Sequence, residues 1–556
     1  MSFQTPVGTC SIHIPGLGKL DGFQYANHVQ QYCGIPYAKL SKRWTRSELN
    51  TSWENDYHDG TKLGPPRGHP ANSQPDGQFK QFIFENVNKG LESIDHFKNV
   101  PDMDELSGLV LNVILPRVPG SDKLPVFAWV HGGSLLFGSS NEPIFDGVNL
   151  VSHSIAIGRP IVFVSMNYRI GLGGFLASEA IRDELSREGH QGCGNFGFTD
   201  QQVAFEWITT YISSFGGDPD RVTAAGESAG GISIGNQLLA ANPPRIQRAI
   251  CMSGLAITLP PWTMDQHENL FRATCRHFDI DPSQPDVLDR LRQIPQRDLA
   301  NATPAIQRVP GGSGNPCIDG WFYAKDPLEI PEQAPDWLEA FMAGDTYHEG
   351  VIFRMNLEGV DYTFVRDTIG KHIGDAEETK KILQEYRIQQ GLPKQALTER
   401  IEHMAGDVLF KIPNLATSYA WQPQLPQSLF MYHFDHQSRM ENGLKGMAYH
   451  AYDLLYLFKN QYQKLDDDEK TLADDFASAW IRFTHDEAPW KASKGQWKVW
   501  GPNAAQSIKT EQEDEMTRSY TRMKRMLKMG NGETWKKWLL GVDELVNLRM
   551  RVGKLD

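Results

Sequence analysis

The chain of 556 residues lacks the cysteine spacing and the short motifs that mark several cofactor chemistries. No two of its six cysteines form a C-x-x-C pair, the spacing typical of zinc and dithiol redox sites. The motifs G-x-x-x-x-G-K-[ST] and H-E-x-x-H are both absent, so the corresponding nucleotide and zinc sites are not indicated. We therefore expect no cofactor and no metal.

Long apolar runs are also absent. No stretch reaches the roughly 18 uninterrupted apolar residues that indicate a transmembrane helix. Residues 1–16 lack the basic segment and the apolar segment that make up a secretion signal. The sequence thus predicts no membrane span and no export. Because scattered cysteines without a disulfide framework fit a reducing compartment, we expect a cytoplasmic location.

The charges are mixed and only weakly one-sided. The net charge is −13, and acidic and basic residues alternate in short patches, which argues against a nucleic-acid surface. One acidic run, residues 466–469, precedes apolar residues at helical spacing, so it predicts a helix N-terminus in preference to a cation site. We expect a small-molecule partner and no nucleic acid.

The bulk composition is that of a globular protein with ample material for a core. Hydrophobic residues make up 40% of the chain, and aromatic residues 10%. No linker, repeat or low-complexity tract divides the sequence, so we expect one domain over residues 1–556. The composition makes no prediction of oligomeric state.

Short apolar runs alternate with helical patterns along the chain. Five runs are nearly unbroken and rich in β-branched residues, as expected for strands covered on both faces: residues 109–115, 126–130, 161–166, 222–225 and 249–252. Residues 200–214 carry an apolar stripe at helical spacing. This alternation predicts an α/β fold with a doubly wound sheet, whose ligand would lie beyond the carboxyl ends of the strands.

The most informative segment is residues 215–231, FGGDPDRVTAAGESAGG. Gly226, Ser228 and Gly230 fit the pattern G-x-S-x-G, in which a serine occupies a strained turn between a strand and a helix. The surroundings agree, because residues 222–225 predict a strand and residues 232–241 predict a helix. Ser228 is therefore our candidate nucleophile.

A longer segment, residues 194–231, resembles the signature of the type B carboxylesterase/lipase family, the cholinesterase-like branch of the α/β-hydrolases. Further similar segments extend the resemblance over nearly the whole chain: residues 34–38, 167–171, 318–320 and 480–483. The resemblance implies a large, mostly parallel sheet with helices on both faces. It also implies ester hydrolysis without a cofactor.

The serine of such an enzyme needs a base and an acid, which follow it in the chain order Ser, acid, His. His450 lies in an H-x-x-D-x-x-Y context that resembles the family's catalytic histidine loop. Glu349, in the pair Glu349-Gly350, resembles the family's catalytic glutamate. Asp345 and Asp453 are the alternative acids, and we rank both below Glu349.

The resemblance also implies an oxyanion hole. Residues 131–134, HGGS, follow a predicted strand and are similar to the family's H-G-G-G loop. The donors would be the backbone N–H groups of Gly133, Ser134 and Ala229, because a tetrahedral intermediate needs preset donors at its oxyanion. We expect Glu227 to be a buried structural residue that points away from Ser228, and Ser253 to give at most a supporting hydrogen bond.

Hydrophobic residues beside these loops predict an apolar substrate pocket, which would favour acyl or aromatic esters. They are Leu135, Leu136, Phe137, Leu255 and Phe353.

Secreted relatives carry an early disulfide whose cysteines would fall near Arg67 and Gly108, and neither position is cysteine here. Residues 64–104 are thus expected to form a mobile flap.

These features together predict a serine carboxylesterase that works through an acyl-enzyme. Two alternatives stay open. The same residues could pass the acyl group to another alcohol or to an amine, depending on how well the site excludes water. A noncatalytic interaction protein is the other alternative, although such proteins usually lose a member of the triad.

Overall fold

The computed structural model describes residues 5–65, 104–118, 123–306, 315–491 and 494–547. The expected flap over residues 64–104 falls almost entirely outside these ranges, since residues 66–103 are not described.

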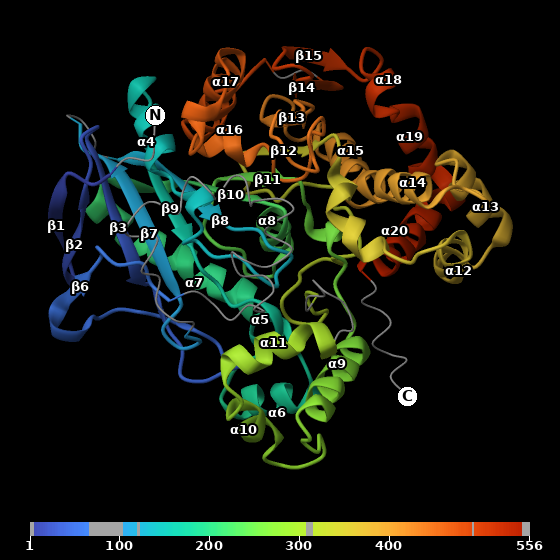
Figure 1. Ribbon diagram of the computed structural model, residues 1–556. Coiled ribbons are helices and arrows are strands. Elements are labelled where there is room, and N and C mark those ends of the chain that lie inside the picture. Colours follow the sequence, from blue (N-terminus) through green and yellow to red (C-terminus); the bar gives the residue numbers. More distant parts are fainter. Residues whose placement is uncertain (1–4, 66–103, 119–122, 307–314, 492–493, 548–556) are drawn as a thin grey trace.

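In the described part of the chain, thirteen strands form one sheet (Figure 1). Twelve of them follow the order β1 (Gly8–Ile14), β2 (Gly18–Gln24), β3 (Val29–Pro36), β7 (Val110–Pro116), β9 (Val162–Met166), β8 (Leu124–Val130), β10 (Gly217–Glu227), β11 (Arg248–Met252), β12 (Ala340–Thr346), β13 (Leu429–Phe434), β14 (Gln496–Trp500) and β15 (Gln506–Thr510). Strand β6 (Tyr57–Asp59) pairs with β2, and β4 (Ala38–Lys39) and β5 (Glu48–Leu49) form a separate ribbon.

The centre of the sheet is parallel and its flanks are antiparallel. All neighbours from β9 through β14 run parallel, whereas the strands from β1 to β7 and the last strand, β15, join antiparallel. The five runs predicted from the sequence are confirmed as β7, β8, β9, β10 and β11. Their unbroken apolar character follows from burial on both faces.

Both faces of the sheet are covered by helices, as alternating residues of β8 show. Phe127 and Trp129 pack in a cluster with α4 (Val148–Ala156), α16 (Leu454–Phe458) and α17 (Asp467–Thr484). Val126, Ala128 and Val130 pack in a second cluster with helices that include α7 (Phe196–Tyr211), α8 (Ala229–Leu239) and α15 (Ile412–Trp421). The predicted helix over residues 200–214 corresponds to α7 and the turn after it.

Two further groups of helices flank this core (Figure 1). One group, at the bottom of the view, shares its own hydrophobic cluster: α5 (Gly171–Phe175), α6 (Glu179–Arg187), α9 (Met264–His277), α10 (Val287–Arg292) and α11 (Gln296–Ile306). The other, at the right, contains α12 (Tyr362–Ile373), α13 (Ala376–Glu385), α14 (Lys394–Gly406), α18 (Glu515–Arg518), α19 (Tyr520–Lys528) and α20 (Glu533–Asn547).

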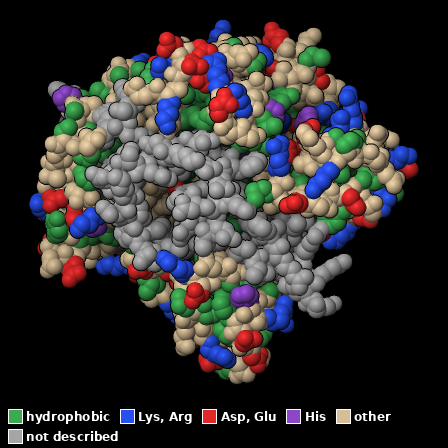
Figure 2. All heavy atoms as spheres, viewed as in Figure 1, with side chains coloured by type: hydrophobic (Ala, Val, Ile, Leu, Met, Phe, Trp, Pro, Cys, Tyr) green, Lys and Arg blue, Asp and Glu red, His purple; other side chains and the backbone are tan. Residues whose placement is uncertain are grey.

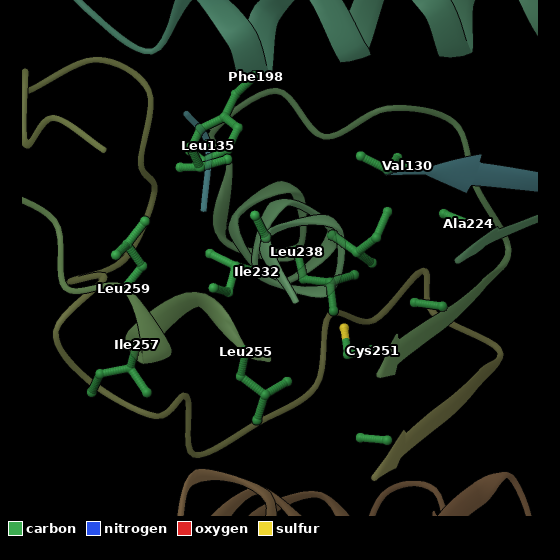
Figure 3. Close-up of a cluster of buried hydrophobic side chains, with 14 of the residues drawn as sticks. Val130, Leu135, Phe198, Ala224, Ile232, Leu238, Cys251, Leu255, Ile257 and Leu259 are labelled. Carbon is green, nitrogen blue, oxygen red and sulfur yellow. The ribbon is translucent and has the colours of Figure 1, made fainter. Parts of the chain in front are cut away.

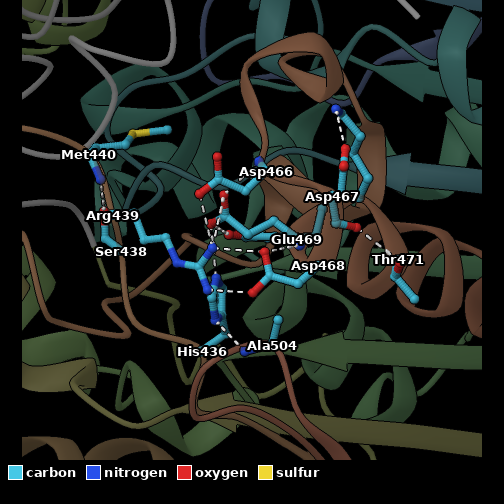
Figure 4. Close-up of polar contacts among 12 residues, drawn as sticks. His436, Ser438, Arg439, Met440, Asp466, Asp467, Asp468, Glu469, Thr471 and Ala504 are labelled. Carbon is cyan, nitrogen blue, oxygen red and sulfur yellow. Dashed lines mark hydrogen bonds and ion pairs between the residues drawn. The ribbon is translucent and has the colours of Figure 1, made fainter.

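The acidic run at residues 466–469 begins α17, as the sequence predicted. The side chain of Glu469 accepts a hydrogen bond of 3.1 Å from the backbone N–H of Asp466 and so closes a capping box. Arg439 pairs with Asp468 at 2.6 Å and with Asp466 at 3.0 Å (Figure 4). These carboxylates are therefore neutralised by an arginine and by a helix N-terminus.

Acidic and basic side chains are intermixed over the described surface visible in Figure 2. None of the helices in the described ranges is both long enough and apolar enough to cross a membrane.

Candidate active site

The loops that carry the candidate residues follow the carboxyl ends of five neighbouring parallel strands, the last of which is β13, whose Phe434 pairs with Thr346 of β12. In the parallel register Gly226 of β10 pairs with Val130 of β8, and Glu227 pairs with Met252 of β11. Met252 in turn pairs with Gly344 of β12. Because the strands are parallel, their carboxyl ends coincide, and the loops that follow them are brought together.

Ser228 occupies a strained turn between β10 and α8. Its backbone lies at φ 55° and ψ −124°, a region that side chains rarely adopt, and its N–H donates a 2.9 Å hydrogen bond to the carbonyl of Met252. A Cβ at Gly226 would lie 2.4 Å from the carbonyl carbon of Gly230, and a Cβ at Gly230 would lie 2.0 Å from the carbonyl oxygen of Val130. The turn thus requires both glycines of the predicted pattern, and Ser228 is left half-exposed at its tip.

His450 and Glu349 form a tight buried pair. Nδ1 of His450 lies 2.5 Å from Oε2 of Glu349, and a carboxylate can only accept, so Nδ1 carries the proton. The other oxygen of Glu349 accepts from the hydroxyl of Ser253 at 2.8 Å and from the N–H of Thr346 at 2.6 Å. These bonds fix the carboxylate, which fixes the imidazole tautomer and leaves Nε2 available as a base.

Glu227 does not point away from the site, so that expectation is wrong. It is buried, but its Oε1 lies 3.1 Å from Nε2 of His450. The contact lacks hydrogen-bond geometry, so within the described residues Nε2 has no hydrogen-bond partner. Glu227 is the last residue of β10 and directly precedes the strained turn at Ser228, and from this position its carboxyl group lies beside the imidazole.

Three buried carboxyl groups surround the imidazole and shift its pKa. Burial alone would lower the pKa of His450, but the charges of Glu227 and Glu349 outweigh it and raise that pKa to about 9. Burial raises the pKa of Glu227 to about 8, although His450 opposes the rise. Burial and the charge of Glu349 likewise raise the pKa of Asp453 to about 7. The site therefore favours a positively charged imidazole.

The two alternative acids have other partners. Asp345 accepts hydrogen bonds from His433 at 2.8 Å, Arg518 at 2.6 Å and Asn414 at 2.9 Å. Asp453 accepts a long hydrogen bond of 3.4 Å from the hydroxyl of Tyr432. The geometry thus favours Glu349 as the acid.

The glycine loop after β8 packs directly on the serine turn. A Cβ at Gly132 would lie 2.7 Å from the carbonyl oxygen of Glu227 and 3.2 Å from Cβ of Ser228, so only glycine fits. Gly133 accepts hydrogen bonds from the N–H groups of Leu136 and Phe137, which close the loop. Within the described residues no backbone carbonyl accepts from the N–H of Gly133, Ser134 or Ala229. These three N–H groups are therefore available as oxyanion donors.

The five residues of the expected pocket differ in exposure. Leu135 and Leu136 are only 0% and 2% exposed, and Leu135 packs in the core cluster with Phe198 and Ile232 (Figure 3). Leu255 and Phe353 are each 8% exposed, and Phe137 is half-buried. The first two leucines are thus buried, whereas Phe137 has the largest exposed fraction of the five.

Two residues beside His450 had no signal in the sequence. His348 forms two hydrogen bonds with Ala448: its N–H donates to the carbonyl at 2.8 Å, and its Nδ1 accepts from the N–H at 3.1 Å. Phe410 lies on the π-helical turn Asp407–Lys411, and its ring meets the His450 imidazole edge to face at 5.2 Å between centroids. Neither contact joins neighbours in sequence, so no local pattern could reveal it.

Comparison with known proteins places the chain among ester hydrolases. The model of the carboxylesterase family matches residues 9–528. Para-nitrobenzyl esterase of Bacillus subtilis is 29% identical over 486 residues, covering 84% of this chain and 88% of that protein. Lipase 3 of Yarrowia lipolytica is 26% identical over 474 residues, covering 83% and 86% respectively.

Solved structures agree with the sequence comparisons. A PNB esterase superposes with a TM-score of 0.70 at 26% identity, covering 92% of this chain and 98% of the other. Three observations indicate the same fold: the parallel centre of the sheet, the serine turn after β10 and the family match. The chain therefore belongs to the carboxylesterase family, and it is a carboxylic ester hydrolase with the α/β-hydrolase fold.

Proposed function

We propose that this protein is a serine carboxylesterase that works through an acyl-enzyme, with Ser228 as nucleophile, His450 as base and Glu349 as acid. The observation that carries the proposal is the buried His450–Glu349 hydrogen bond of 2.5 Å. Nε2 of His450 lies 3.1 Å from Oε1 of Glu227, the residue next to Ser228, so the imidazole lies at the serine turn.

In the first half of the reaction the hydroxyl of Ser228 attacks the ester carbonyl, and its proton passes to Nε2 of His450. Glu349 at Nδ1 and Glu227 near Nε2 stabilise the imidazolium that forms. The N–H groups of Gly133, Ser134 and Ala229 would receive the oxyanion. The imidazolium then returns the proton to the departing alcohol.

In the second half, water replaces the alcohol. His450 takes a proton from the water as it attacks the acyl group on Ser228, and it then returns this proton to Oγ of Ser228 as the carboxylic acid leaves. The chain's own residues supply every proton transfer in this scheme.

For the substrate class, we propose carboxylic esters with apolar acyl or aromatic groups. The support is the partly exposed ring of Phe137 beside the glycine loop, together with Leu255 and Phe353. Similar proteins include an esterase named for the para-nitrobenzyl group and a lipase, both of which fit apolar esters.

The deciding experiment compares the wild type with Ser228→Ala in hydrolysis of p-nitrophenyl acetate and butyrate. Intact mass after treatment with an organophosphate reports covalent labelling. We expect the substitution to remove both turnover and labelling, while Ser213→Ala, a change at an exposed serine upstream of β10, keeps both. A folded wild type that neither turns over nor labels would refute the proposal.

The two alternatives are less well supported than hydrolysis. A noncatalytic role does not explain a strained serine turn together with a buried His–Glu pair. Acyl transfer uses the same residues, and it is separated from hydrolysis by adding an alcohol to the assay and measuring the ratio of ester to acid formed.

A further inference from the structure

Three sulfur atoms meet outside the active site, in the hydrophobic cluster shared by α5, α6 and α9. The thiol of Cys193 lies 3.3 Å from the sulfur of Met264, and the thiol of Cys317 lies 3.5 Å from the same sulfur. Because both thiols contact one sulfur atom, they are neighbours across the Met264 side chain. The two cysteines are far apart in sequence, and both are completely buried.

The backbone holds these two cysteines against each other. Asn195 donates a side-chain hydrogen bond of 2.8 Å to the carbonyl of Cys317 and accepts one of 2.7 Å from its N–H. A Cβ at Gly194 would lie only 2.8 Å from Cβ of Cys317, so the chain next to Cys193 is in direct contact with Cys317. The approach of the two thiols is therefore built into the fold and does not depend on flexible side chains.

We propose that Cys193 and Cys317 form an oxidation site, at which a hydroperoxide such as hydrogen peroxide converts the two thiols into an intramolecular disulfide. One thiolate attacks a peroxide oxygen, the O–O bond breaks, and a sulfenic acid and water result. The second thiolate attacks the sulfenic sulfur, the S–S bond forms, and the hydroxyl leaves as a second water. Two thiols and one peroxide thus give one disulfide and two waters.

The surroundings set the rate of this reaction. Met264 is half-buried, so the two thiols lie one side chain below the surface. The neighbouring Cys193 thiol and burial together raise the pKa of Cys317, which makes its thiolate scarce at neutral pH. We therefore expect slow oxidation that accelerates at alkaline pH.

The other cysteines provide internal controls. All six are free thiols in the structure, and Cys10, Cys33, Cys251 and Cys275 complete the set. Cys10 is half-buried and makes its side-chain contacts with Tyr32 and Phe23. Selective loss of two thiols out of six would therefore point to Cys193 and Cys317, the two cysteines whose thiols contact Met264.

The test uses the full chain, reduced and then treated with hydrogen peroxide. The protein is unfolded in guanidinium with N-ethylmaleimide, and the intact mass gives the number of alkylated thiols. We expect six before oxidation and four afterwards, a peptide that joins Cys193 to Cys317, and recovery of six after reduction. Retention of all six thiols, oxidation of Met264 alone, or a cross-link through another cysteine would overturn the proposal.

Variants make the assignment specific. Cys193→Ser and Cys317→Ser each leave five thiols, and we expect all five to escape disulfide formation; Cys10→Ser also leaves five and should fall to three. Because the cross-link would close a long loop, the melting temperature of the oxidised wild type should rise by on the order of 5 °C over the reduced form. None of these measurements depends on ester hydrolysis, so they stand or fall independently of the proposed function.

Discussion

Oε1 of Glu227 lies 3.1 Å from Nε2 of His450, the nitrogen that must take the proton of Ser228. Because Glu349 holds Nδ1 of the same ring, the imidazole lies between two buried carboxyl groups. A base must be neutral to accept a proton, and the two charges raise the pKa of His450 to about 9. The neutral fraction thus grows as pH rises through that value, and we expect kcat/KM to rise with it.

Replacing Glu227 by Gln should shift this pH dependence. The variant keeps the shape of the side chain but removes a charge that raises the pKa of His450, so the acid limb of the kcat/KM profile should move to lower pH. Above the limb, the rate should fall by about 10-fold, because the imidazolium loses a stabilising carboxylate. The profile on p-nitrophenyl butyrate checks both effects. A limb that coincides with that of the wild type would show that Glu227 does not act on His450.

Replacing Glu349 by Gln should nearly abolish turnover. An amide can present its NH₂ group to the imidazole, which stabilises the wrong tautomer, and the expected loss in kcat is roughly 10⁴-fold. Ser253→Ala serves as the control, since it removes one hydrogen bond from the carboxylate and leaves the charge in place. Its kcat should fall only several-fold. A Glu349→Gln enzyme that keeps most of its kcat would remove Glu349 from the proposed triad.

His348 should position the two loops that carry Glu349 and His450. Its two hydrogen bonds with Ala448 join the residue before the acid to a residue two positions before the base. Burial, together with Lys411 and Arg518, lowers the pKa of His348 to about 4, so Nδ1 is free to accept at neutral pH.

His348→Leu removes the acceptor, and we expect kcat to fall by about 10–100-fold with little change in KM, because misplaced catalytic groups slow the chemical step. His348→Asn offers an oxygen near the position of Nδ1 and should restore most of the rate. Equal losses in both variants, or a change in KM alone, would contradict a positioning role.

Phe137 should influence substrate preference, and Leu135 should influence stability. Phe137→Ala enlarges the exposed side of the site, so the ratio of kcat/KM for p-nitrophenyl octanoate to that for the acetate should change. Leu135→Ala removes a fully buried side chain, and the free energy of unfolding should fall by about 2–5 kcal/mol with the ratio unchanged. Denaturant unfolding measures the change in stability, and hydrolysis of the two esters measures the change in substrate preference. The reverse pattern would place Leu135 in the pocket and Phe137 outside it.

The sequence alone was sufficient for features that depend on neighbouring residues. The strand–turn–helix around Ser228 could be predicted because the turn needs small residues at fixed offsets, and the structure shows the contacts that exclude a Cβ at Gly226 and Gly230. The five central strands could be predicted because burial on both faces demands unbroken apolar runs. Glu349 and His450 were found by their resemblance to family motifs, and neither has a local signal strong enough to stand alone.

Only the tertiary structure decided which distant groups meet. The contact of Glu227 with His450, the hydrogen bonds of His348 with Ala448 and the approach of Cys193 to Cys317 each join segments about 100 residues or more apart. The burial of Leu135 was likewise invisible in the sequence. Such contacts depend on strand order, register and side-chain rotamers. Periodicity and short motifs determine where strands, helices and turns form along the chain, but they do not specify how those elements pack against one another in space.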